Sequence, residues 1–163
     1  MSTDRPLSEP EQSAEADIGA QMISLLTQQC ALYKRLAVLA DTQHSLITGN
    51  RPEQLLTVLA DRQTLLDELH QLAERMRPYQ ERWPNLRATL HRGKVDAIDQ
   101  LLKEVNQLLR GILEKDKADA QLLAAQKQTT GAAIASCKAG RKAETAYATQ
   151  AYGQQACRDW TDQ

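Results

Sequence analysis

The sequence predicts an all-α protein: a long antiparallel helical hairpin with a third long helix on it, forming an elongated three-helix bundle or coiled coil. Aromatic residues make up 4% of the 163 residues and Phe is absent, whereas Leu and Ala, which favour helices, are abundant. Large apolar residues recur at helical spacing over three long stretches. Glycine and proline separate these stretches, as expected at helix ends.

The amino-terminal part predicts a flexible leader and then a long helix. Residues 1–17 carry five acids, one base and two prolines, and bury too little surface to order. Beyond them a helix is predicted over 18–48, since large apolar residues repeat every seven positions: Ile18, Leu25, Leu32, Leu39 and Leu46. The opposite positions are polar except for Val38. Gln29 and Gln43 lie on the apolar face, either to set the register of the bundle or to contact a partner helix.

A tight turn joins this helix to a second one. Gly49 and Asn50 tolerate positive φ, and Pro52 suits the first turn of a helix, so we expect a hairpin with a second helix over 52–77. Arg62 is the only charge near its apolar stripe, and its stem is expected to carry the charge outward. The predicted inward positions are Leu55, Leu56, Val58, Leu59, Leu65, Leu66, Leu69, Leu72, Ala73 and Met76.

Two prolines predict an interruption before the third helix. Pro78 and Pro84 lack an amide donor and restrict the residue before them. We therefore expect a basic connector over 76–93, either as a solvated loop at the end of the bundle or as a docking patch. The third helix is predicted over 94–127, and its dense apolar stripe ends at Leu113.

Residues 128–163 form an Ala-rich tail whose large apolar groups are Ile134, Tyr147, Tyr152 and Trp160. Burying four such side chains stabilises by at most about 6 to 12 kcal/mol, whereas ordering the backbone costs about 1 to 2 kcal/mol per residue. We therefore expect a weakly ordered or partly helical tail, which becomes more helical when a partner supplies apolar surface.

Composition and motifs argue against several functions. A net charge of −1 gives no field that attracts nucleic acid, and the three cysteines have neither disulfide nor zinc spacing. The first residues lack a secretion signal, and no stretch approaches the ~18 apolar residues of a membrane span, so we expect a cytoplasmic protein with reduced thiols. The sequence has no phosphate-binding glycine loop, HExxH or GxSxG, so we predict no cofactor and no enzymatic activity.

Two acid-x-x-His pairs, Asp41 with His44 and Asp67 with His70, are distantly similar to the helical motif of carboxylate-bridged diiron bundles. The first pair points away from the predicted core, and the two pairs lie at different levels of the hairpin. We therefore predict surface histidines and no metal site.

The stretch LLTQQCALYKRLAVLADTQHSLITGNRPEQLLTVLADRQTLLDELHQLAER resembles the first half of FlgN-type flagellar export chaperones. The shared features are a long helix with a mid-helix Tyr, a Gly-Asn turn and a helix with paired leucines, and they cover residues 21–75. Residues 94–125 are consistent with the third helix of that family. The tail sequences GRKAETAY and AYGQQ are similar to its C-terminal region, where a Tyr is often followed by Gly.

The resemblance implies a cytoplasmic chaperone that holds the hook-filament junction proteins FlgK and FlgL until their export through the flagellar type III apparatus. It implies a client site, which binds the C-terminal helices of these proteins, at Leu113, Leu122, Leu123 and Ile134. Tyr152, or alternatively Tyr147, corresponds to a tail Tyr that contacts the cytoplasmic domain of the export gate. The alternative is that both are ordinary tail tyrosines.

Two other classes of function stay open. A self-associating coiled-coil structural or tether protein uses the same apolar stripes, and a monomer or weak homodimer fits either a chaperone or a tether. A helical-bundle enzyme is the third class, and two bound iron or manganese ions in the purified protein are its signature.

Overall fold

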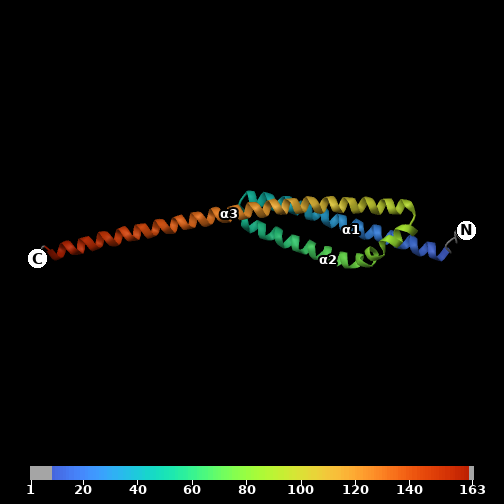
Figure 1. Ribbon diagram of the computed structural model, residues 1–163, viewed down its shortest axis with the longest axis horizontal. Helices are drawn as coiled ribbons and strands as arrows, with labels where there is room; N and C mark the ends of the chain where they lie inside the picture. Colours follow the sequence, from blue (N-terminus) through green and yellow to red (C-terminus); the bar gives the residue numbers. More distant parts are fainter. Residues whose placement is uncertain (1–8, 162–163) are drawn as a thin grey trace. The chain divides into compact units, whose positions relative to one another are not determined.

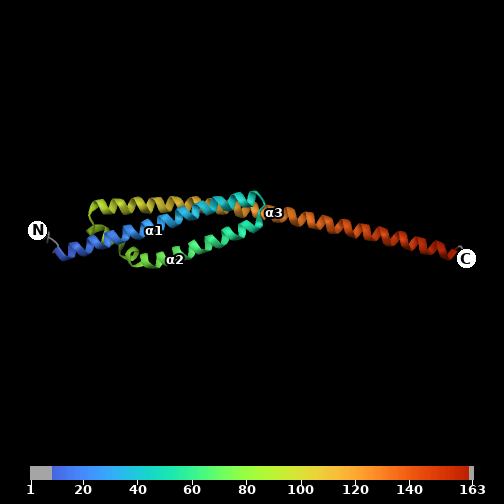
Figure 2. The same cartoon turned by 180° about the vertical axis from the view of Figure 1, so that it is seen from behind.

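The computed structural model describes the backbone of residues 9–161 and the side chains of residues 13, 14 and 16–142. It contains α1 (Glu9–Thr48), α2 (Pro52–Thr89) and α3 (Arg92–Thr161), and no strand occurs within the described residues. The predicted all-α fold with three long helices is confirmed. The chain divides into a first unit, Met1–Asp119, and a second unit, Ala120–Gln163. In the first unit, α1, α2 and the beginning of α3 run side by side (Figures 1 and 2).

The turn between α1 and α2 has the conformation that its residues predict. Asn50 adopts a positive φ of 52°. The amide of Gly49 donates to the carbonyl of Ser45 at 2.9 Å, and the amide of Arg51 donates to that of Leu46 at 3.0 Å. These bonds satisfy the last carbonyls of α1. With Pro52 as its first residue, α2 then runs back along α1.

The first helix starts earlier than predicted. It begins at Glu9 and not at residue 18, so the expectation of a flexible leader over 1–17 is wrong for residues 9–17. This stretch is rich in Glu and Ala, which favour helix. The Nζ of Lys94 in α3 donates to the carbonyl of Ala16 at 2.6 Å. Gly19 lies so close to α3 that a Cβ there would come within 2.9 Å of the Lys94 side chain.

The second helix continues through both prolines, so the predicted connector over 76–93 is wrong. α2 extends to Thr89 with Pro78 and Pro84 inside it, and it bends before it turns into α3 (Figure 1). A proline removes one hydrogen bond and kinks a helix without necessarily ending it. The helix ends at Leu90, whose backbone is extended and whose side chain is buried. The turn into α3 is therefore anchored in the core.

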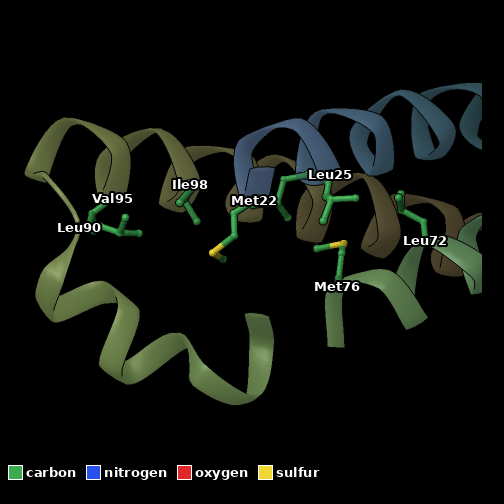
Figure 3. Packing of buried hydrophobic residues seen from close by; sticks show 8 residues of the cluster. Met22, Leu25, Leu72, Met76, Leu90, Val95 and Ile98 are labelled. Carbon is green, nitrogen blue, oxygen red and sulfur yellow. The ribbon is translucent and has the colours of Figure 1, made fainter. Parts of the chain in front are cut away.

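Two apolar clusters hold the three helices of the first unit together. Near the α2–α3 turn, side chains from all three helices point into the space between them (Figure 3); the labelled ones are Met22, Leu25, Leu72, Met76, Leu90, Val95 and Ile98. Further along the bundle a second cluster contains Leu36, Leu65, Leu69 and Ile112. Each fully buried side chain of this kind stabilises the fold by about 1.5 to 3 kcal/mol.

The second unit is helical as far as Thr161, so the predicted end of the third helix at residue 127 is wrong. Gly131 and Gly140 lie inside the helix and do not interrupt it. Many of the surrounding residues are Ala, Gln and Lys, whose propensity favours helix. The side chains of residues 123–142 are all exposed, in agreement with the prediction that this segment has few apolar groups to bury. Within the described residues, none of the helices combines the length and apolar character that a membrane span requires.

Candidate functional site

A layer of buried polar side chains crosses the first unit near the α1–α2 turn. Arg62 of α2 is 9% exposed, and its two Nη atoms donate to the two carboxylate oxygens of Asp116 in α3, each at 2.7 Å. Arg62 Nη1 also donates to Oε1 of Gln43 in α1 at 2.6 Å. The prediction that Arg62 carries its charge outward is therefore wrong, because a bidentate carboxylate pairs the guanidinium inside the bundle.

The layer continues from Gln43 to a second carboxylate. Gln43 Nε2 donates to Oδ2 of Asp119 at 3.0 Å, and His44 Nδ1 lies 2.6 Å from the other oxygen. Asp119 is 1% exposed, yet every buried polar side-chain atom within the described residues has a hydrogen-bond partner. His44 and His70 are exposed, as predicted for surface histidines, and His44 in addition contacts the buried carboxylate of Asp119. The register-setting interpretation of Gln43 is supported, because its amide joins Arg62 to Asp119.

Ion pairs along the contact between α1 and α3 fix these helices as parallel neighbours. Lys34 lies 2.7 Å from Glu104, and Asp41 pairs with Lys115. The hydrogen bond from Lys34 lowers the pKa of the Glu104 carboxyl, whereas burial and then Glu104 raise the pKa of the Cys30 thiol. Cys30 therefore stays a neutral thiol at neutral pH.

Four large side chains of α2 and α3 in the first unit remain exposed, and together they define what we call the open face. The exposed fractions are 69% for Leu56, 45% for Leu59, 44% for Leu66 and 58% for Leu113. Exposed leucines are ordinary when scattered, but several on one face indicate an interaction surface. The contacts of α2 and α3 with each other and with α1 show on which side of the bundle these four side chains lie.

The bond between Arg62 and Asp116 places the four leucines on the same side of the bundle. At about 100° per residue, Leu59 and Leu66 lie on one side of Arg62, about one turn before and after it, and Leu56, six residues before Arg62, is rotated further in the same sense, by about 120°. Leu113 lies about one turn before Asp116, rotated in the same sense. Because α2 and α3 are antiparallel, both rotations lead to the same side of the contact between them.

Helix α1 lies on the other side of that contact. On α2, Glu68 lies 3.9 Å from Arg35 of α1, and Asp61 and Thr64 line a groove with α1; all three are rotated from Arg62 in the sense opposite to Leu59. On α3, Glu104 and Lys115 pair with α1 and are rotated away from Leu113. The open face therefore lies where α1 does not cover α2 and α3.

A groove also lies between α1 and α2. Its volume is about 510 Å³, and it is lined by Arg35, Val38, Leu39, Asp61, Thr64 and Leu65. Val38 is 63% exposed there, as its place among polar positions predicts. With one exposed apolar side chain among charged and polar ones, this groove is a weaker docking surface than the open face.

The client residues implied by the resemblance fall into different units. Leu113 belongs to the open face. In the second unit Leu122 is half-buried, Leu123 is 42% exposed and Ile134 is 51% exposed. Leu123 and Ile134 are eleven residues apart, which places them on the same side of the helix about 16 Å apart. The side chains of Tyr147 and Tyr152 lie outside the described residues.

The sequence reasoning missed most of the open face. Leu56, Leu59 and Leu66 were predicted to point inward, but the buried positions of α2 are Val58, Arg62, Leu65, Leu69, Leu72 and Met76. In each adjacent pair, such as Leu65 with Leu66, a rotation of about 100° lets one member face the core while the other turns away. The adjacent leucines were themselves the available signal. A helix that packs through two positions of each heptad needs fewer leucines than α2 has, so the additional leucines lie outside the contact.

Comparison of the chain with protein-family models, with curated proteins and with solved structures gives no match. The open face and the polar layer are therefore the features that bear on its function.

Proposed function

We propose that this protein is a cytoplasmic chaperone that binds the C-terminal helices of the hook-filament junction proteins FlgK and FlgL and delivers them to the flagellar type III export apparatus. The observation that supports a helix-binding function is the open face, where Leu56, Leu59, Leu66 and Leu113 stay exposed on the side of the bundle that α1 does not cover. The identity of the client rests on the resemblance over residues 21–75.

An amphipathic guest helix has the shape that fits this face. Lying along α2 and α3, it covers the leucines with its own apolar residues and becomes a fourth helix of the bundle. About half of each of four leucine side chains is then buried, which stabilises the complex by about 3 to 6 kcal/mol before the cost of association is subtracted. Such a modest gain suits a carrier that has to release its client.

The second unit offers a further contact. Leu123 and Ile134 are exposed on one side of the same helix, so a client that reaches both covers about three turns. Under this proposal Tyr152, or alternatively Tyr147, contacts the cytoplasmic domain of the export gate. The protein performs no catalysis in this role.

Titration calorimetry and circular dichroism with C-terminal segments of FlgK and FlgL test the proposal. We expect binding heat and a helix signal larger than the sum of the separate components. Replacing both Leu66 and Leu113 with Gln should weaken binding by at least about 10-fold, because each change removes part of the apolar contact. The matched control is Val38→Gln, which changes an exposed apolar residue outside the open face and should leave binding unchanged. Absence of both heat and added helix with the wild-type chain would refute the proposal.

A further inference from the structure

The two helices that form the open face carry opposite charges along it. On α2, Glu53, Asp67 and Glu74 recur at multiples of seven residues, and all three are exposed; Glu74 is also paired with Arg77 of the same helix at 2.5 Å. On α3, Lys103, Arg110 and Lys117 recur every seven residues and are exposed as well. A seven-residue interval is about two helical turns, so each set forms a line along one side of its helix. One edge of the face is therefore mainly acidic and the other mainly basic.

Two members of each line are matched in level along the bundle. Arg62 and Asp116 are level because they are hydrogen-bonded, and the helices are antiparallel. Asp67, five residues after Arg62, is therefore level with Gly111, which is next to Arg110.

The same count applies to Glu74 and to Leu66. Glu74, twelve residues after Arg62, is level with Glu104, the neighbour of Lys103. Leu66 is level with Ile112, the neighbour of Leu113. Asp67 and Glu74 are thus level with Arg110 and Lys103, and Leu66 with Leu113, to within about one residue.

We propose that in the free protein a second copy of this chain covers the open face, with the two-fold axis parallel to the helices. Rotation about such an axis keeps every residue at its level and exchanges the two edges, so that α2 of each copy lies on α3 of the other. Leu66 then meets Leu113 of the partner subunit. Asp67 meets Arg110 of the partner subunit, and Glu74 meets Lys103 of the partner subunit. Each contact occurs twice.

The charge pattern disfavours the other two-fold arrangement. An axis perpendicular to the helices places α2 on α2 and α3 on α3, so that acids face acids and bases face bases. Like charges in contact destabilise an interface. The level-matched lines therefore select a second copy in one orientation as the occupant of the face.

The size of the face predicts a weak dimer. The stretch from Leu59 to Glu74 is about 22 Å long, and two helices are about 20 Å wide, which gives a footprint of about 440 Å² per copy. Stable interfaces cover about 800 Å² per partner. The dimer is therefore expected to be weak and transient, within reach of competition by a client helix.

Sedimentation equilibrium of the full chain, from low to high micromolar concentrations, tests the inference. The expected mass rises with concentration from 18.2 kDa towards twice that value. Reversing the acidic line with Asp67→Arg and Glu74→Lys should weaken self-association at least 10-fold, and so should reversing the basic line with Lys103→Glu and Arg110→Glu. Mixing the two double variants should restore dimers, because each then presents the charge that the other lacks. All four positions are exposed, so the variants should fold.

The matched control is Asp61→Arg, a charge reversal at an exposed position on the α1 side of α2, which should leave the dimer unchanged. The inference is overturned if the wild-type chain is a monomer throughout, if neither double variant weakens the dimer, or if the mixed variants do not associate. No client is present in these measurements, so their failure leaves the chaperone proposal standing, and the failure of client binding leaves the dimer standing.

Discussion

Removing Asp116 should destabilise the bundle by leaving a buried guanidinium without its carboxylate. The Arg62 side chain is 11% exposed and that of Asp116 is 34% exposed. Breaking a buried ion pair from one side costs about 3 to 5 kcal/mol. Because Asp116 is partly exposed and Gln43 still accepts a bond from Arg62, we expect Asp116→Ala to lower the free energy of unfolding by about 3 kcal/mol, at the low end of that range. Urea unfolding followed by circular dichroism measures it.

The structure supplies a matched control at the other end of the same two helices. Arg87 of α2 donates both Nη atoms to Asp99 of α3 at 2.9 Å each, so the chemistry and the helices are the same. The side chains of this pair are 51% and 39% exposed, and exposed pairs contribute about 0 to 1 kcal/mol. Asp99→Ala should therefore cost less than about 1 kcal/mol. Equal losses of unfolding free energy for Asp116→Ala and Asp99→Ala would refute the claim that burial makes the Arg62–Asp116 pair the more important of the two for stability.

Three further predictions follow from the same contacts. In a chain carrying Cys137→Ser and Cys157→Ser, the buried Cys30 should react with a thiol reagent at least about 100-fold more slowly than in urea, whereas the exposed Cys137 should react at once in the wild type. The hydrogen bond from Lys34 lowers the pKa of the Glu104 carboxyl in the folded protein. The stability that this carboxylate contributes is therefore present above its unfolded pKa of about 4.5 and is lost as the pH falls through the lower folded value. The loss of unfolding free energy caused by Glu104→Gln, measured by urea unfolding, should accordingly shrink on acidification. Removing residues 128–163 should lower the total helix signal without moving the thermal midpoint of the bundle, and a large drop in that midpoint would show that the segment belongs to the core.

The sequence predicted the hairpin closely because its determinants are local. Gly49, Asn50 and Pro52 specify one turn, and a seven-residue repeat specifies one buried side of α1. The prolines at positions 78 and 84 were over-weighted for the opposite reason. Their effect depends on whether tertiary contacts hold the helix on either side, and Arg87 with Asp99 does so from another helix. No pattern within 76–93 reports that contact.

The candidate site was harder to predict, because it depends on which residues of different helices come level. Arg62 in an apolar stripe was visible, but its partner Asp116 lies 54 positions away, beyond the point where the stripe of α3 weakens. The same weakening made Leu113 look like the beginning of a sparse tail stripe. In the structure Leu113 completes a face with leucines of α2 that the sequence had placed in the core.

The polar layer and the open face are linked through the level of α2 against α3. Apolar contacts alone tolerate a slip of one helix along another, since a leucine finds a similar neighbour about one turn away. Arg62 does not tolerate it, because a slip of α3 by one turn, about 5 Å, removes the carboxylate of Asp116 and leaves the buried guanidinium without a counter-charge. A buried charge pair of this kind adds little net stability compared with apolar residues of the same size, but it penalises every wrong register. We infer that the polar layer selects one register of α2 against α3. In that register Leu66 is level with Leu113, and this is the arrangement of the open face that either a client helix or a second copy must match.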